Sequence, residues 1–304
     1  MISDMVRLVR FRHWIKNVVV LMPVVFSSQM NDAEAWFRAG GAAIAFCFAS
    51  AFSYIVNDIR DKESDRNHPL KKDRPIASGS VGVGPAIVEA VVFFLAATLI
   101  AGSISTLLLL VVSVYIMLQI LYSLFLKHAA LIDVICIAFG FVLRAVAGAV
   151  AIRVEISPWL FICIFTLCLF MGFCKRCNEL VTIGDAARAG EHRPTLLEYT
   201  PQLLTHLITL SAGIAVVAFL LYGLSDRTIS RFGTDYFVYT LPIMVYGIFR
   251  FAMLSMKGAY ADPTDLILRD RPFQVTIVVW MAAAIMIIRC GKELASWISD
   301  MYCR

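Results

Sequence analysis

The sequence predicts an all-α membrane protein with nine membrane-spanning helices. Of its 304 residues, 60% are hydrophobic and only 16% are charged, and the mean hydropathy is +0.79. A soluble domain of this size would carry about a quarter of charged residues. Apolar runs long enough to cross about 30 Å of hydrocarbon recur along the whole chain. The predicted spans are 14–28, 36–58, 83–102, 105–125, 130–152, 157–178, 203–224, 236–256 and 272–294.

The basic residues indicate which ends of these helices face the cytoplasm. Of the 27 Lys and Arg residues, 18 lie in or beside one set of alternate hydrophilic segments, and seven lie on the opposite side. The basic segments are 1–16, 59–82, 126–129, 175–202 and 257–271. By the positive-inside rule these segments and the N-terminus are cytoplasmic, and the C-terminus is outside. We therefore expect one catalytic domain, residues 1–304, in the bacterial inner (plasma) membrane, with its active site facing the cytoplasm.

A cluster of acidic residues ends the second predicted span, in the pattern N-D-x-x-D-x-x-x-D. It contains Asn57, Asp58, Asp61 and Asp65. If the helix continues through this stretch, the three carboxylates share one face within two turns, where they repel one another. Such charges are costly near hydrocarbon, and a cation would relieve the repulsion. Oxygen ligands favour Mg²⁺ shared with substrate phosphates, with Mn²⁺ as a substitute; the alternative is an ordinary solvated loop.

Basic residues follow the aspartates directly, in the remainder of "NDIRDKESDRNHPLKKDRPIASG" (57–79). Arg66, Lys72 and Arg74 are the candidates for contact with a ligand. Anionic lipid headgroups would explain part of any polybasic segment beside a membrane. Because these bases alternate with carboxylates, they also suit a polyanionic ligand that a metal has already partly neutralised.

A second hydrophilic cluster leaves the sixth predicted span with "KRCNEL" (175–180) and ends with "RPTLLEYT" (193–200). Its candidate binding residues are Lys175, Arg176, Glu179 and Tyr199. Arg recognises phosphate with a planar fork of donors and Lys as a point charge. Positive-inside topology alone is the competing explanation for the bases.

Further candidates lie in or beside the spans. Asp133 and Arg144 are eleven residues apart in the fifth predicted span, so they share a face but are too distant to pair. Ionisable residues inside a membrane point to function, although an ion pair with a neighbouring helix would also explain them. The other candidates are Tyr122 and Lys127 at the end of the fourth span and Lys16 and Asn17 at the start of the first.

These stretches together resemble the UbiA superfamily of intramembrane prenyltransferases. Within it the chain is most similar to the branch that transfers phosphoribose to a polyprenyl phosphate. The resemblance rests on the aspartate motif, on the basic "KRCNEL", and on "RFRHWIKN" (10–17), "KHAALIDVICIAFGFVLRAVAGAVA" (127–151) and "DLILRDRP" (265–272). Aromatic prenyltransferases have a second aspartate-rich motif where this chain is basic. The chain departs from the branch at Phe11, where proline is usual, and at Cys177, where tyrosine is favoured.

The resemblance implies a UbiA-like fold, phosphoribosyl pyrophosphate as donor and a decaprenyl-like polyprenyl phosphate as acceptor. Asp58, Asp61 and Asp65 would be the catalytic residues and would bind Mg²⁺ on the pyrophosphate, with Asn57 beside them. Lys175, Arg176 and Glu179 would hold the ribose or its 5-phosphate. The acceptor phosphate would meet bases from other segments. Those candidates are Lys16, Lys127 and Arg144.

The implied partners are the two substrates and the membrane, with no nucleic acid, and a homo-oligomer is compatible with the resemblance. The product would serve as an arabinan precursor or as the precursor of another arabinosylated glycolipid. Two other functions stay open. One is aromatic prenyl transfer from a prenyl diphosphate, and the other is transport of an anionic metabolite or lipid, which would favour an inverted repeat with broken helices.

Overall fold

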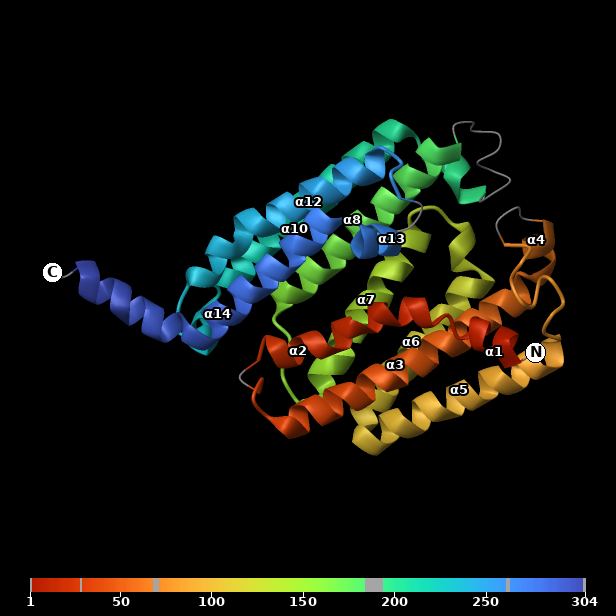
Figure 1. The fold of residues 1–304 in the computed structure, drawn as a ribbon, viewed down its shortest axis with the longest axis horizontal. Helices are drawn as coiled ribbons and strands as arrows, with labels where there is room; N and C mark the ends of the chain where they lie inside the picture. The colour runs from red at the N-terminus through yellow and green to blue at the C-terminus, as the bar shows by residue number, and fades with distance from the viewer. Residues whose placement is uncertain (1, 28, 68–70, 184–193, 261–262, 303–304) are drawn as a thin grey trace. The chain divides into compact units, whose positions relative to one another are not determined.

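The structure is a computed structural model, and it describes residues 2–27, 29–67, 71–183, 194–260 and 263–302 (Figure 1). Helices and short turns make up this part of the chain, and no β-strand occurs in it. The chain divides into two compact units: unit 1 is Met1–Val25 with Gln29–Glu155, and unit 2 is Phe26–Ser28 with Ile156–Arg304. The prediction of one catalytic domain stays a prediction.

Unit 1 is a bundle of four long helices with shorter elements packed along it. The α-helices are α1 Ile2–Leu8, α2 Met22–Val25, α3 Ala33–Arg60, α4 Lys62–Asn67, α5 Val83–Ile104, α6 Thr106–Leu124 and α7 Ile132–Ala151, and the 3₁₀ helices are η1 Phe11–Leu21 and η2 Leu126–His128. In this unit α3 packs against α5, α6, α7 and η1.

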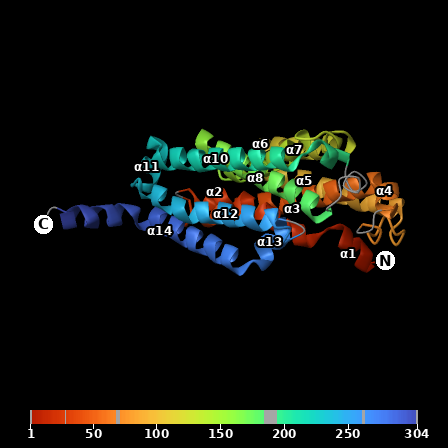
Figure 2. The ribbon, with the colours of Figure 1, turned by 90° about the horizontal axis from the view of Figure 1, so that it is seen from above.

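Unit 2 also contains four long helices, which run alongside one another (Figure 2). Its α-helices are α8 Pro158–Ile183, α10 Pro201–Leu224, α11 Asp226–Phe232, α12 Leu241–Met256, α13 Pro263–Arg269 and α14 Arg271–Tyr302, and its 3₁₀ helices are η3 Pro194–Glu198 and η4 Tyr236–Thr240. Its core is aromatic, with Phe237 in ring contact with Phe219, Tyr222, Phe232 and Trp280.

Within the described residues, eight helices are long and apolar enough to cross a membrane. They correspond to eight of the nine predicted spans. The remaining one, 14–28, differs because η1 is a 3₁₀ helix of 11 residues, followed by only four residues of α-helix in α2. A 3₁₀ helix rises about 2.0 Å per residue, so 11–25 still extends about 28 Å. The count of nine and the cytoplasmic N-terminus stay predictions.

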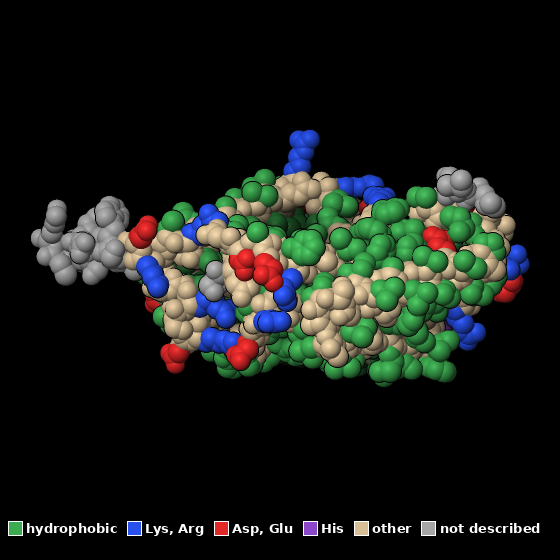
Figure 3. Space-filling view, turned by 90° about the horizontal axis from the view of Figure 1, so that it is seen from below, with side chains coloured by type: hydrophobic (Ala, Val, Ile, Leu, Met, Phe, Trp, Pro, Cys, Tyr) green, Lys and Arg blue, Asp and Glu red, His purple; other side chains and the backbone are tan. Residues whose placement is uncertain are grey.

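Side-chain polarity explains how the helices pack. Small residues form the centre of unit 1: Ala42, Ala45 and Ala49 of α3 and Ala147 of α7 are fully buried. Small residues let helices approach closely in a membrane. Large apolar side chains lie outside instead, including Phe37 (84% exposed) and Leu99 (71% exposed), and hydrophobic side chains cover much of the face in Figure 3. A surface of this kind suits lipid rather than water.

Side-chain caps explain where several helices begin. Asp32 accepts a hydrogen bond from the backbone N–H of Glu34 at the start of α3. Ser105 and Thr200 cap α6 and α10 in the same way, through the N–H groups of Leu108 and Leu203. Each oxygen satisfies one of the N–H groups that have no partner within their helix.

Gly148 allows η1 to approach α7 closely. A Cβ atom added at Gly148 would lie 1.9 Å from the backbone oxygen of Val20. We expect Gly148→Ala to push η1 away from α7 and to lower the free energy of unfolding by about 1–3 kcal/mol. Thermal unfolding in detergent measures the change. In Gly40→Ala, the matched control in α3, the added Cβ meets nothing within 4 Å. If both variants unfold at the wild-type temperature, the close approach of η1 to α7 does not contribute to stability.

Asp270 fixes the start of α14 in unit 2. Its carboxylate accepts hydrogen bonds from Arg250 Nε (2.6 Å) and Nη2 (2.8 Å) and from the N–H of Phe273 (2.8 Å). The hydrogen bond from Arg250 is the largest cause of a lowered pKa of Asp270, and the N–H of Phe273 and the charge of Arg250 add to it against the effect of burial.

The lowered pKa of Asp270 predicts how stability depends on pH. The stabilisation is present above the unfolded pKa of about 3.9 and is lost as the pH falls through the lower folded value. We therefore expect the difference in unfolding free energy between wild type and Asp270→Asn to be largest near neutral pH and to shrink below about pH 4. Thermal unfolding between neutral and acidic pH tests this, with the exposed Asp235→Asn as control. A difference that does not change with pH would contradict it.

Candidate functional site

The three aspartates lie where α3 ends and α4 begins. Asp58 is in the last turn of α3, Asp61 is the residue between the two helices, and Asp65 is in α4. Helical hydrogen bonds continue across the junction, from Asp61 N to Asn57 O (2.9 Å) and from Asp65 N to Asp61 O (2.8 Å). Asp58 is 3% exposed and Asp65 is 2% exposed. Asp58 and Asp65 therefore provide two buried carboxylates, as expected if the motif forms one face of a helix.

Two arginines bind these buried carboxylates. Arg10 Nη2 donates to both oxygens of Asp58, at 2.6 and 2.7 Å. Arg74 Nη1 lies 3.1 Å from Asp58 Oδ1 and 2.6 Å from Asp65 Oδ2, so one cationic nitrogen is shared by two carboxylates. Lys71 Nζ approaches Asp65 to 3.9 Å. Asp58 and Asp65 are thus close enough to hold one cation between them.

Asp61 has a separate partner. Lys127, in η2, donates to Asp61 Oδ1 at 2.5 Å and to Asn57 Oδ1 at 3.3 Å, and the Asn57 amide donates to Asp61 Oδ2 at 3.1 Å. The side chains of Asp61 and Lys127 are 26% and 13% exposed. This contact joins the aspartate motif to a residue 66 positions later in the chain.

The donor set fits a hard divalent cation. In the described part of the chain, no three His, Cys, Asp or Glu side chains converge as a ready-made metal cage. Mg²⁺ usually needs only one or two carboxylates, together with waters and substrate phosphates. Asp58 and Asp65 offer such a pair, because they already share the cationic Arg74 Nη1. The surrounding bases would meet phosphate oxygens that the metal does not neutralise.

Arg10 is the site residue that sequence reasoning missed. It lies between α1 and η1 in the left-handed backbone conformation (φ 51°, ψ 53°), which is uncommon outside glycine. Its guanidinium is 5.1 Å from the ring centre of Tyr54, a cation–π contact. The first basic residue of "RFRHWIKN" was a signal, but its approach to Asp58, 48 positions away, requires the fold.

The other candidates in unit 1 lie around this cluster or farther from it. Arg66 donates to the backbone oxygen of Ala77 (3.0 Å) and to Glu63, and so braces the 71–80 turn. Lys72 is exposed, and Lys16 and Tyr122 are half-buried. The roles of these four residues stay predictions.

Arg144 is the centre of a second polar cluster inside unit 1. It is 5% exposed and donates to Asn17 Oδ1 (2.7 Å), the backbone oxygen of Gly140 (2.8 Å), Tyr115 OH (2.9 Å) and Ser50 Oγ (3.3 Å). Ser50 precedes Asp58 by eight residues on α3, about 12 Å along the helix axis. The structure therefore unites Arg144 with Asn17 and separates them from the aspartates. Asp133, in the first turn of α7, is fully buried.

In unit 2 the predicted basic motif forms the C-terminal end of α8. Arg176 is 1% exposed and forms an ion pair with Glu179, three residues later. Lys175 is half-buried and Tyr199, which follows η3, is 4% exposed. Asn178 donates to the backbone oxygen of Tyr260 (2.7 Å), so it ties the motif to the segment after α12. Residues 184–193 of the predicted cluster lie outside the described residues.

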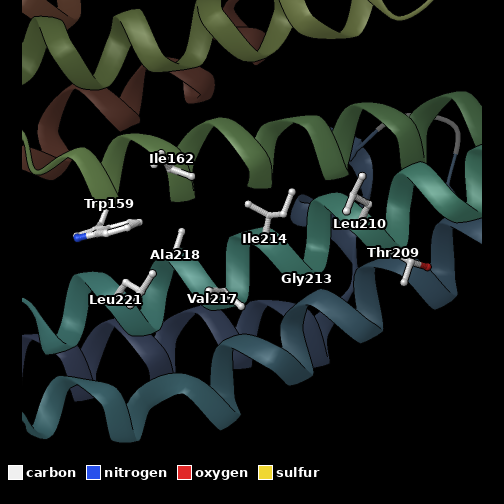
Figure 4. Close-up of a pocket in the computed structure, with 9 residues that line it drawn as sticks. All are labelled: Trp159, Ile162, Thr209, Leu210, Gly213, Ile214, Val217, Ala218 and Leu221. Atoms are coloured by element: carbon white, nitrogen blue, oxygen red, sulfur yellow. The ribbon is translucent and has the colours of Figure 1, made fainter.

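Unit 2 also has an apolar groove of about 380 Å³ between α8 and α10 (Figure 4). Trp159 and Ile162 line it from α8, and Leu210, Ile214 and Leu221 line it from α10. None of the predicted site residues lies in it. Its lining is apolar apart from the side chain of Thr209.

Comparisons with known proteins show the family and the fold. A model of the UbiA prenyltransferase family matches residues 20–269. The decaprenyl-phosphate phosphoribosyltransferase of Mycolicibacterium smegmatis is 34% identical to the chain over 292 residues, covering 92% of this chain and 91% of the relative. The enzyme of the same name from Mycobacterium tuberculosis (strain ATCC 25618 / H37Rv) is 33% identical over 289 residues, 93% of each chain.

Solved structures show the same fold at low sequence identity. A UbiA homologue from Archaeoglobus fulgidus, bound to GPP and Mg²⁺, matches with a TM-score of 0.68 and 19% identity, covering 94% of this chain and 99% of that one. A digeranylgeranylglyceryl phosphate synthase structure matches with a TM-score of 0.65 and 15% identity, covering 94% of this chain and 98% of that one. The predicted all-α, UbiA-like fold is confirmed.

Proposed function

Because the chain belongs to the UbiA prenyltransferase family, we propose that it is a transferase that moves 5-phosphoribose from phosphoribosyl pyrophosphate to a polyprenyl phosphate. The observation that carries this proposal is the similarity to decaprenyl-phosphate phosphoribosyltransferases over more than nine-tenths of the chain. The enzyme is a multi-pass membrane protein, and we place its active site at the cytoplasmic face, where the donor is available.

The reaction forms a bond between an oxygen of the acceptor phosphate and C1 of the ribose, and pyrophosphate leaves with the electron pair of the broken C1–O bond. A phosphate monoester is already anionic at neutral pH, so the attacking oxygen needs no strong general base. The chemical demand is therefore to bring two polyanions together and to stabilise the leaving pyrophosphate. A site built of carboxylates, guanidinium groups and an ammonium group meets this demand.

The described contacts suggest a role for each part of the site. Asp58, Asp61 and Asp65 would hold Mg²⁺, which would neutralise the pyrophosphate as it leaves. Arg10, Arg74 and Lys127 already lie on these carboxylates and would contact the remaining phosphate oxygens. Asn57 orients both Asp61 and Lys127. Mn²⁺ has the same preference for oxygen ligands and would substitute.

The basic end of α8 would bind the sugar part of the donor. Arg176 is buried and its guanidinium is oriented by Glu179, so it is a fixed fork suited to the 5-phosphate. Glu179 and Lys175 would complete the contacts to the ribose hydroxyls and phosphate. This basic motif is what favours a phosphorylated sugar over a prenyl diphosphate as the donor.

The acceptor would bind with its phosphate toward the bases and its hydrocarbon chain among the helices. Lys16, Lys127 and the Arg144–Asn17 pair are the candidates for the acceptor phosphate, while Arg66, Lys72, Tyr122 and Tyr199 would complete the binding surface. The apolar surface of the helices lets the lipid tail extend into the bilayer.

Substrate-dependent release of pyrophosphate tests this proposal. We expect purified protein in detergent with Mg²⁺ to release pyrophosphate only when phosphoribosyl pyrophosphate and decaprenyl phosphate are both present. Geranyl diphosphate with 4-hydroxybenzoate is the parallel assay for aromatic prenyl transfer. Release in the second assay and none in the first would replace phosphoribosyl transfer by prenyl transfer, and release in neither would remove both.

A further inference from the structure

Arg74 occupies a position between two buried carboxylates that a metal ion could also take. Its Nη1 atom lies 2.6 Å from Asp65 Oδ2 and 3.1 Å from Asp58 Oδ1. Arg10 Nη2 also donates to both oxygens of Asp58. Asp58 therefore accepts from two guanidinium groups, and Asp65 accepts from one of the same two.

A divalent ion and a guanidinium nitrogen cannot occupy this position together. The ion would lie about 2.0–2.1 Å from its oxygens if it were Mg²⁺, and two cations in van der Waals contact would repel strongly in a partly buried site. Binding of the metal between Asp58 and Asp65 must therefore displace the Arg74 side chain. The displaced guanidinium then needs a new anionic partner, which a diphosphate provides.

The local structure allows the Arg74 side chain to move while its backbone stays in place. Arg74 N donates to Lys71 O (3.0 Å), and Arg74 O accepts from Ser78 N (2.8 Å). The next residues are anchored, since Ile76 is fully buried and Ala77 is 3% exposed. The Arg74 side chain itself is 26% exposed. Its outer face is thus open to a ligand.

We propose that Arg74 is an exchangeable cation: it binds Asp58 and Asp65 until a divalent metal takes these carboxylates, and it then binds the diphosphate. Metal and diphosphate consequently bind with positive cooperativity. The metal frees the Arg74 guanidinium for the diphosphate, and the diphosphate frees the two carboxylates for the metal. Arg10, which donates to both oxygens of Asp58, keeps that carboxylate in place during the exchange. This inference rests on the proposed function, since it assumes that the site binds a metal–diphosphate pair.

Mn²⁺ binding followed by electron paramagnetic resonance tests the exchange without turnover. In Arg74→Gln, Asp58 and Asp65 lose the one cation that they share, while Arg10 stays on Asp58 and Lys71 stays near Asp65. We therefore expect Mn²⁺ alone to bind about tenfold tighter than in wild type, a change of about 1.4 kcal/mol. The same variant loses a phosphate contact. We therefore expect the affinity for pyrophosphate, measured by calorimetry at saturating Mg²⁺, to fall by about tenfold. Opposite changes in the two affinities are the signature of exchange.

Two further variants serve as controls. Arg74→Lys keeps a cation in reach of the aspartates, so its affinity for Mn²⁺ alone should stay near that of wild type. Arg38→Gln removes the same charge from the start of α3, where Arg38 pairs with Glu34, and it should change neither affinity by more than about twofold. Arg38→Gln therefore reports any effect of net charge alone.

The outcomes separate the exchange from a purely structural ion pair. If Arg74→Gln weakens Mn²⁺ binding, or leaves it unchanged while retaining the wild-type unfolding temperature, the inference is wrong. If Arg74→Gln does not fold, Arg74→Lys takes its place as the test. The inference is then wrong if the affinity of Arg74→Lys for Mn²⁺ departs from that of wild type. Neither result tests the proposed function, because pyrophosphate release from phosphoribosyl pyrophosphate is assayed independently.

Discussion

Asp61→Asn is expected to lower turnover by about 10²–10³-fold while leaving the protein folded. Asp61 is the carboxylate that Lys127 and Asn57 surround, and replacing it removes a negative charge from the group that would hold the metal–pyrophosphate. Asparagine has the same shape and can still accept from Lys127. Lys127 is 13% exposed, but it keeps Asn57 Oδ1 as an acceptor, so its charge still has polar partners after the change.

Turnover and unfolding temperature, measured on the same preparation, check this result. Asp73→Asn is the matched control, because Asp73 lies in the same acidic and basic stretch but its side chain is exposed. We expect wild-type turnover from that control. Near-normal turnover of Asp61→Asn would remove Asp61 from the metal-binding group.

Arg144→Met is expected to produce the largest loss of stability, about 2–4 kcal/mol in the free energy of unfolding. Four oxygens from Asn17, Ser50, Tyr115 and Gly140 would lose the guanidinium that serves them. Within the membrane no water replaces a lost donor, so the unsatisfied acceptors are costly. Relief from burying a positive charge offsets part of the loss.

Unfolding of this variant is measured by the thermal midpoint in detergent, with Arg38→Met as control. Arg38 is on the surface of α3 and pairs with Glu34, so its replacement should change stability by no more than about 0.5 kcal/mol. An unchanged midpoint for Arg144→Met would mean that this polar cluster does not support the fold. A raised KM for polyprenyl phosphate in the folded fraction would support contact of Arg144 with the acceptor.

Hydropathy was sufficient to predict most of the helices. Eight of the predicted spans match helices to within a few residues, because a membrane demands about 20 apolar residues for each crossing. The first span was harder. An apolar run shows that a segment is buried or faces lipid, but it does not distinguish an α-helix from a 3₁₀ helix. The 3₁₀ geometry of η1 depends on tertiary contacts, such as that of Val20 with Gly148 of α7.

The site was partly predictable for a similar reason. The spacing of Asp58 and Asp65 implied a shared helix face, and the structure lets one arginine nitrogen bind both. The break at Asp61 and its pairing with Lys127 were not predictable, since they depend on a contact across 66 residues. Arg10 was missed because its role follows from a left-handed backbone turn. Arg144 could be recognised as unusual, but only the structure shows that Asn17 binds it.

The fate of the ribose in a doubly labelled donor tests the central claim most directly. Phosphoribosyl pyrophosphate carrying ¹⁴C in the ribose and ³²P in the 5-phosphate is incubated with the purified protein, Mg²⁺ and decaprenyl phosphate, and the lipid is extracted. Phosphoribosyl transfer predicts that both labels enter the lipid in a ratio of one to one and that Asp61→Asn transfers neither. An unlabelled lipid from active protein, alongside prenylation of 4-hydroxybenzoate by the same preparation, would contradict it.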